Sequence, residues 1–70
     1  MTYRFDFGKG LKEVQLEQRV SSSELARRLN VHRQQVSHWR SRKDAKLSLV
    51  VKVCNGLDVE VYDFLERSRD

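Results

Sequence analysis

The feature of the sequence that most constrains its fold is a pair of short helical patterns within residues 22–40, joined by a turn of three or four residues that contains an asparagine. The apolar residues that recur at helical spacing are Leu25, Ala26 and Leu29 in the first pattern and Val36 and Trp39 in the second. Residues with this spacing share one face of a helix. Asn30 stands between the patterns, and asparagine tolerates the left-handed conformation that ends helices. The sequence therefore predicts two short helices that meet at a tight turn.

A serine marks where the first of these helices begins. Ser21 is followed three residues later by Glu24, which fits a capping box. In this motif the serine hydroxyl accepts a backbone N–H that the first helical turn leaves unpaired. We therefore expect one helix over residues 22–29 and a second that begins at residue 32 or 33 and ends near residue 40.

The remaining helical patterns predict three more helices, over about residues 9–18, 47–55 and 59–67. The residues expected to face inward are Phe7, Leu11 and Val14, then Leu47, Val50, Val51 and Cys54, then Tyr62 and Leu65. Gly56 is expected to cap the fourth helix and Asp58 to begin the fifth. The predicted fold class is all-α, a compact five-helix domain.

The N-terminal arm, residues 1–7, has a different pattern. Residues 2–7 alternate apolar and polar side chains, as an extended strand does. A segment this short cannot form a sheet alone, so the arm either packs its aromatic side chains on the domain or pairs with the arm of a second protomer. We favour the packed arm, because terminal segments are ordered only where something ties them down.

Length and composition exclude several classes of protein. Seventy residues are enough for one domain, residues 1–70. Cys54 is the only cysteine, and His32 and His38 lack the i, i+4 spacing of a helical metal site. No nucleophile stands beside a base, and no glycine-rich phosphate loop is present. We therefore expect no enzyme activity, catalytic residue, metal, cofactor or small-molecule ligand. On its apolar stripe, Cys54 is interpreted as a buried structural thiol.

Positive charge is concentrated in the middle of the chain. Residues 19–46 carry eight basic and two acidic side chains, whereas the whole chain has a net charge of +4. Such a segment is typical of a surface that binds a polyanion. Arg27 and Arg28 are the exception, and we interpret them as a solvated helix face. No run is apolar and long enough for a membrane span or a signal peptide, so we expect a cytoplasmic protein without membrane association.

The predicted helix that ends near residue 40 has polar residues on its outer face with no obvious internal partner: Arg33, Gln34, Ser37 and His38. Together with the small Ala26 where the two helices cross, they indicate a helix-turn-helix unit over residues 22–40. Arg33 can donate to O6 and N7 of guanine, and Gln34 can pair with N6 and N7 of adenine. The cations suited to backbone phosphates are Arg40, Arg42, Lys43 and Lys46. These residues predict binding of double-stranded DNA.

Residues 22–40 closely resemble the helix-turn-helix of the Cro/CI-type (lambda repressor-like) family. That family's pattern of alanine, glycine, a branched apolar residue and tryptophan or leucine is matched here by Ala26, Asn30, Val36 and Trp39. Residues 57–66 look like the family's fifth helix. The resemblance implies that the start of the third helix enters the major groove. The small size resembles Cro-like regulators, which implies a bacterial cell or a phage-infected host.

The resemblance also implies roles for single residues. The positions that face bases are occupied by His32, Arg33, Gln34, Ser37 and His38. Ser22 and Ser23 stand where the family's second helix meets a phosphate, and Lys43 matches a loop lysine that grips the backbone. With the cations named above, the expected phosphate contacts are Ser22, Ser23, Arg40, Arg42, Lys43 and Lys46.

Four positions in α-helical and loop segments depart from the family's usual pattern. The family usually has an arginine where Gln15 stands and a glutamate where Arg40 stands, and the two often form a buried salt bridge. That pair cannot form here, so we expect Arg40 to be free to touch DNA or another carboxylate. Arg42 replaces the usual glycine, and the usual proline near the end of the loop is missing. These changes leave the path of the loop open.

One domain of this size reads few base pairs, so we expect a homodimer on a palindromic operator with half-sites roughly 34 Å apart. Leu49, Val53 and Phe64 fall off the predicted core stripes. The expected dimer interface comprises Leu57, Val59 and Phe64. The predicted function is a sequence-specific transcription regulator that represses by occupying its operator. The alternative is a protein-interaction module, such as an antitoxin-like or anti-repressor partner, whose third helix would expose apolar residues.

Overall fold

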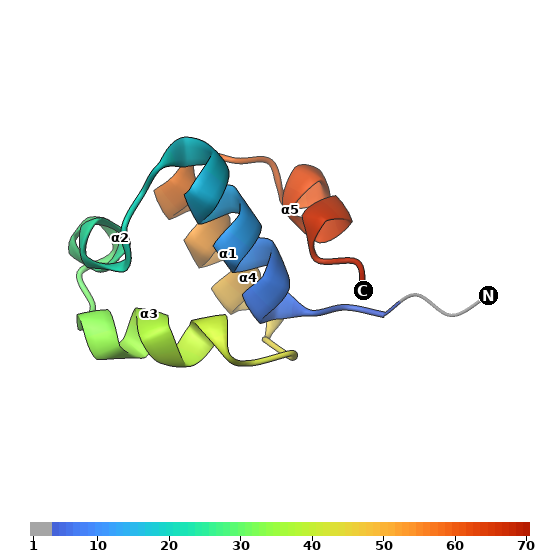
Figure 1. Ribbon diagram of the computed structural model, residues 1–70, viewed down its shortest axis with the longest axis horizontal. Helices are drawn as coiled ribbons and strands as arrows, with labels where there is room; N and C mark the ends of the chain where they lie inside the picture. The colour runs from blue at the N-terminus through green and yellow to red at the C-terminus, as the bar shows by residue number, and fades with distance from the viewer. Residues whose placement is uncertain (1–3) are drawn as a thin grey trace.

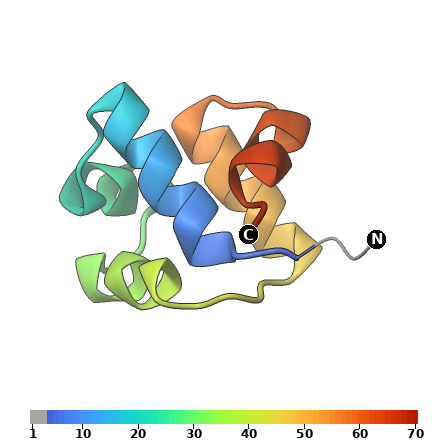
Figure 2. The same cartoon turned by 45° about the vertical axis from the view of Figure 1, so that its right-hand side comes forward.

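The computed structural model describes residues 4–70, and its secondary structure there is five helices with no strand of a sheet. The helices are α1 (Phe7–Gln18), α2 (Ser22–Leu29), α3 (Arg33–Arg40), α4 (Leu47–Leu57) and α5 (Val61–Arg67). Figure 2 shows α1 in the middle, with α2 and α3 on one side and α4 and α5 on the other. The predicted all-α, five-helix fold is confirmed.

The first helix begins two residues earlier than predicted. Asp6 has extended backbone angles, and its side chain accepts a hydrogen bond from the backbone N of Lys9 at 3.1 Å. This is an N-cap, so α1 starts at Phe7. The predicted inward stripe of this helix is confirmed, because Phe7, Leu11 and Val14 are all buried.

Only a short part of the described N-terminal arm remains outside α1. Phe5 forms an isolated antiparallel bridge with Arg69, and the backbone N of Asp70 donates to the carbonyl of Arg4 at 3.0 Å. The segment that precedes α1 and the C-terminal residues therefore lie side by side, as Figure 1 shows for the described part of the chain. Packing of the arm on the domain is confirmed for residues 4–6, while Thr2 and Tyr3 lie outside the described residues.

The helix-turn-helix forms where the sequence predicts it. The Ser21 hydroxyl accepts a hydrogen bond from the backbone N of Glu24 at 3.0 Å. At the other end of α2, Asn30 adopts the left-handed conformation, with φ 57° and ψ 47°. Only half of the capping box is used, because the Glu24 carboxylate pairs with Arg27 and Arg28 instead of turning back to Ser21.

The predicted end of α4 is wrong. The helix continues through Gly56 to Leu57, and Asp58 adopts the left-handed conformation that ends it. Gly56 serves close packing instead, since a Cβ atom there would lie 2.6 Å from Cδ2 of Leu29. Asp58 does not begin α5 either, because Glu60 is the residue that precedes its first turn.

The predicted inward face of α4 is also partly wrong. Val50 and Cys54 are buried as expected, but Leu47 is 68 % exposed and Val51 is 39 % exposed. The buried face instead contains Val50, Val53, Cys54 and Leu57. These four also have helical spacing, so the sequence contains two overlapping apolar stripes, and packing against α2, α5 and α1 selects between them.

The inward face of α5 is set by Phe64 rather than Tyr62. Phe64 has no exposed surface, and its ring centroid lies 5.7 Å from that of Phe7 in α1. Tyr62 was expected to face inward and is 71 % exposed. A phenol at the surface keeps its hydroxyl hydrated, whereas the fully apolar Phe64 ring closes the core between α1 and α5.

Candidate nucleic-acid interface

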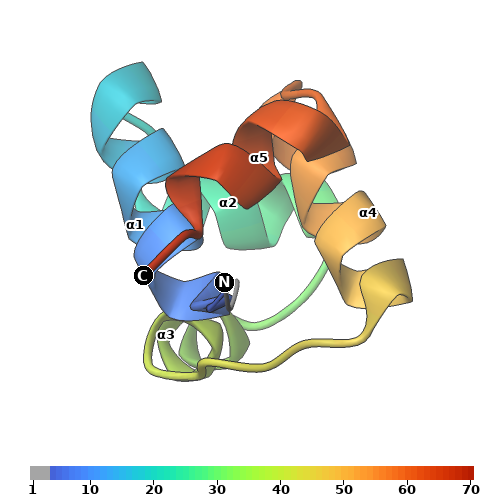
Figure 3. The same ribbon diagram turned by 90° about the vertical axis from the view of Figure 1, so that its right-hand side faces the viewer.

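Helix α3 lies at one edge of the bundle, with one side against α1 and α2 and the other facing away from all helices (Figure 3). Val36 and Trp39 form its buried side, with exposed fractions of 0 % and 5 %. Trp39 is therefore a core residue. The five predicted base-contacting residues are all exposed: His32, Arg33, Gln34, Ser37 and His38.

These five side chains form no hydrogen bond or ion pair with other groups of residues 4–70. They include the donors of arginine, the mixed donor and acceptor of glutamine, and two imidazoles. Such groups read base edges because each base pair shows its own pattern of donors and acceptors in the major groove. This arrangement can dock an α-helix, with its polar side outward, into a DNA groove.

The loop after α3 is held against the start of α1 by backbone contacts. The backbone N of Phe7 donates to the carbonyl of Lys43 at 2.9 Å, and that of Gly8 donates to the carbonyl of Arg42 at 2.7 Å. These bonds satisfy two N–H groups that the first turn of α1 would otherwise leave unpaired. They also fix the loop path that the sequence left open, and leave Arg42, Lys43 and Lys46 exposed beyond the end of α3.

The close packing of Gly8, in α1, against this loop was not predicted from the sequence. A Cβ atom on Gly8 would lie 2.3 Å from the carbonyl oxygen of Arg40 and 2.9 Å from that of Arg42. The backbone of α1 can therefore approach the loop only because residue 8 has no side chain. A glycine inside a helical pattern was the available signal, since it costs helix propensity and needs another reason to be there.

The two serines predicted to meet a phosphate lie at the start of α2. Ser23 is exposed and Ser22 is half-buried, while the neighbouring Ser21 is the one that caps the helix. Beside them is a surface hollow of about 460 Å³ between α1, α2 and α3. Its lining residues are Lys12, Gln15, Leu16, Arg19, Val20, Ser21, Ser22 and Arg40.

Arg40 is not free, which corrects the expectation from the missing salt bridge. Its Nη1 donates a hydrogen bond to Oε1 of Gln15, a residue that is only 4 % exposed. The positions that carry an arginine–glutamate pair in the family pattern thus remain in contact here, with the positive charge on α3 and a neutral amide on α1. A buried role for Gln15 was not predicted, because glutamine is usually exposed.

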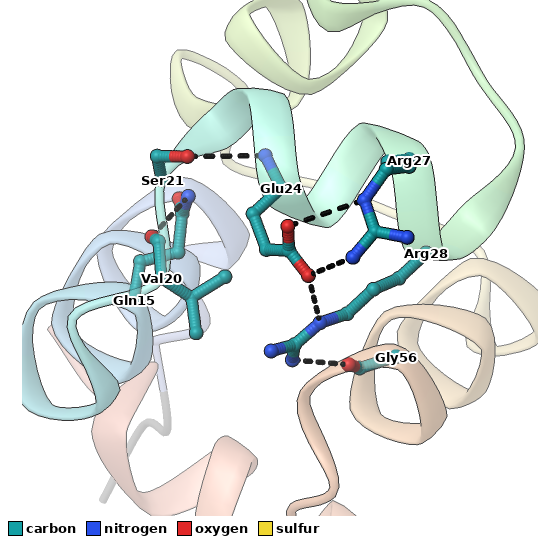
Figure 4. Close-up of polar contacts among 7 residues, drawn as sticks. All are labelled: Gln15, Val20, Ser21, Glu24, Arg27, Arg28 and Gly56. Atoms are coloured by element: carbon teal, nitrogen blue, oxygen red, sulfur yellow. Dashed lines mark hydrogen bonds and ion pairs between the residues drawn. The ribbon is translucent and has the colours of Figure 1, made fainter.

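Arg27 and Arg28 turn toward their own helix and its neighbour. Both guanidinium groups bind the Glu24 carboxylate, at 2.6 Å and 3.0 Å, and Arg28 also donates to the carbonyl of Gly56 at 3.1 Å (Figure 4). Hydrogen bonds from the two arginines lower the pKa of Glu24. Both side chains are exposed, as expected of a solvated helix face, and both are paired with Glu24 on the surface of the domain.

The residues predicted for the dimer interface are mostly not at the surface. Leu57 and Phe64 have no exposed area, and neither has Val53, which was predicted to fall off the core. A side chain with no accessible surface has none to offer a second protomer, so these placements are wrong. Val59 is half-buried and remains available. Among residues 4–70, the large apolar side chains at the surface are Leu16, Leu47, Val51 and Tyr62.

The described residues, 4–70, also bear on metal binding, membrane association and the single cysteine. No group of histidine, cysteine and carboxylate side chains in this part of the chain could hold a metal ion. None of its helices is both long and apolar enough to cross a membrane. Cys54 is buried as predicted, and burial raises the pKa of its thiol to about 11. A thiol held in its neutral form is a poor nucleophile.

The five-helix bundle carries a helix-turn-helix whose second member, α3, exposes polar side chains beside exposed cations. This combination defines a DNA-binding domain. The family model of the Cro/C1-type HTH DNA-binding domain matches residues 10–70. The chain therefore belongs to the Cro/C1-type helix-turn-helix family. Comparison with functionally characterised proteins gives no match.

Proposed function

We propose that this protein is a sequence-specific transcription regulator that binds an operator in double-stranded DNA and represses by occupying it. The observation that carries the proposal is the two-sided character of α3. Val36 and Trp39 fasten one side to the core, and the other side presents five polar side chains without internal partners. A rigid helix that offers such groups outward has the form of a recognition helix.

Base recognition is assigned to the residues on that outer side. Arg33 suits guanine as a bidentate donor, and Gln34 suits adenine, each discriminating by roughly 1–3 kcal/mol. The remaining proposed base contacts are His32, Ser37 and His38. Backbone phosphates are assigned to Ser22, Ser23, Arg40, Arg42, Lys43 and Lys46, which position the domain without reading sequence.

Dimerisation on a palindromic site is part of the proposal, with a relocated interface. The exposed apolar residues of the C-terminal half are Leu47, Val51 and Tyr62, and the half-buried Val59 lies on the connection between α4 and α5. Apolar side chains at a surface favour association because contact removes them from water. We assign the contact between protomers to this α4–α5 side of the domain.

The test is selection from random duplex DNA, followed by sedimentation of the protein on the enriched site. The proposal predicts an inverted repeat that binds two protomers. The double variant Leu47→Ser/Val51→Ser should bind as a monomer, whereas the control Leu16→Ser, on exposed α1 surface, should still dimerise. Absence of binding to any duplex would refute the proposal and favour a protein-interaction module. A strict monomer on an enriched site would refute the dimer alone.

A further inference from the structure

The side chain of Gln15 joins three helices at one amide group. Its Nε2 donates to the carbonyl of Val20 at 3.2 Å, as Figure 4 shows, and lies 3.5 Å from Oγ of Ser22 at the start of α2. Its Oε1 accepts the hydrogen bond from Arg40 at the end of α3. Gln15 itself belongs to α1 and is buried. One side chain therefore ties the first helix to both helices of the helix-turn-helix.

The two ends of this amide cannot exchange roles. A guanidinium group only donates hydrogen bonds, so it must meet Oε1, and a carbonyl only accepts them, so it must meet Nε2. A glutamate at position 15 would turn an oxygen toward the Val20 carbonyl, and an apolar residue would serve neither partner. Glutamine holds the guanidinium of Arg40 without adding a negative charge beside it.

Arg40 is thus bonded to a neutral amide, and the carboxylates of Asp6 and Glu13, which line a second hollow with Arg40, form no ion pair with it. No carboxylate in the described part of the chain forms an ion pair with it. Arg40 lines the 460 Å³ hollow at the start of α2 together with two further cations, Lys12 and Arg19. A guanidinium group has five N–H donors, so the bond to Gln15 leaves others available to a ligand. The hollow is therefore cationic and open to the solvent.

We propose that Gln15 is a positioning residue for DNA binding: it holds the Arg40 guanidinium in this hollow with its charge uncompensated, so that Arg40 binds a backbone phosphate. The inference rests on the proposed function and deepens it. Gln15 is buried and acts through Arg40. In this role Gln15 sets the number of phosphate contacts, which a residue that only stabilises the fold would not do.

The experiment is a double-mutant cycle of Gln15→Met, Arg40→Met and the combined variant, with operator affinity measured from 50 to 200 mM salt. The logarithm of affinity falls with the logarithm of salt concentration, with a slope of about −0.9 for each neutralised phosphate. Arg40→Met should make the slope shallower by about 0.9 per protomer. The parent-to-variant ratio of affinities should therefore be about 3.5-fold larger at 50 mM than at 200 mM for one protomer, and about 12-fold larger for a dimer on its operator. Gln15→Met should produce the same change, and the combined variant no more.

Two further variants keep the test independent of folding. Arg40→Lys keeps the charge and should keep the parent's slope. Gln18→Met removes another α1 glutamine, whose Nε2 donates to the carbonyl of Leu57 at 2.7 Å, and should also keep the slope. Thermal unfolding identifies any variant that is not folded at the temperature of the assay.

The outcomes separate the two proposals. If the parent binds its operator and Gln15→Met lowers stability without changing the salt slope, the positioning role is overturned and Gln15 is structural. An unchanged slope in Arg40→Met overturns the phosphate contact. If the parent itself binds no duplex, the proposed function fails first and this inference falls with it.

Discussion

Replacement of Gly8 by alanine is expected to destabilise the domain, although alanine favours helices. A Cβ atom at this position would lie 2.3 Å from the carbonyl oxygen of Arg40, whereas ordinary contacts begin at 3.4 Å. The atoms it meets belong to the backbone, so no side-chain rotation relieves the overlap. The start of α1 and the loop after α3 must therefore move apart by about 1 Å, the difference between the two distances.

The magnitude follows from what that movement breaks. The two backbone hydrogen bonds from Phe7 and Gly8 to the loop are worth about 0.5–1.5 kcal/mol each, and overpacking costs about 1–3 kcal/mol. Alanine returns about 1 kcal/mol of helix propensity. We expect the free energy of unfolding to fall by about 3 kcal/mol, within a range of about 1–5 kcal/mol.

Chemical denaturation followed by circular dichroism measures this loss. The control is Gly56→Ala, where the added Cβ would meet the end of the Leu29 side chain at 2.6 Å. A side chain yields more easily than a backbone carbonyl, so the control should lose less stability. Gly8→Ala should also weaken DNA binding, because the displaced loop carries Arg42 and Lys43. A Gly8→Ala variant as stable as the parent would refute the packing argument.

Two further predictions concern the core. Phe64→Ala should lower the free energy of unfolding by about 3–5 kcal/mol, whereas Tyr62→Ala on the same helix should change it by about 0.5 kcal/mol or less; equal losses in a denaturation experiment would contradict the placement of Phe64 in the core. Burial raises the pKa of the Cys54 thiol to about 11, above its ordinary value of 9.0, so the folded state holds this proton more tightly than the unfolded state. The stability that this provides is complete below pH 9 and is lost as the pH rises toward 11, and Cys54→Val should remove that part of the decline. Denaturation midpoints measured from pH 8 to 11 check it, and identical profiles for the parent and Cys54→Val would contradict it.

The helix-turn-helix was predictable because its signals are local. Ser21 caps α2 through an amide three residues away, and Asn30 ends the same helix by its own backbone conformation. Neither depends on a distant part of the chain. The exposed side of α3 followed in turn, since Val36 and Trp39 left only one face for the polar residues.

The register of α4 was not predictable from periodicity. Apolar residues occupy so many positions of this helix that two overlapping stripes have acceptable spacing, one through Leu47 and Val51 and one through Val53 and Leu57. Only contact with the other helices selects the second stripe. Leu57 was misplaced because the predicted end of this helix fell short of it, and Phe64 because the wrong apolar stripe of α5 was expected to face inward.

Contacts between residues far apart in the sequence were not predictable either. The bond between Gln15 and Arg40 spans 25 positions, and Gly8 meets the loop that begins after residue 40. The sequence did show that the family's arginine–glutamate pair is missing at positions 15 and 40. That the same two positions remain joined through a neutral amide depends on how α1 and α3 pack.

The most direct test of the central claim is the base preference of an Arg33→Ala variant, measured on the selected operator and on all single-base-pair substitutions of it. If the start of α3 reads bases, the variant should fold normally and lose discrimination at one position of each half-site, by roughly 1–3 kcal/mol, while preferences elsewhere are retained. A variant that keeps the full set of base preferences of the parent would contradict the assignment of α3 as the recognition helix.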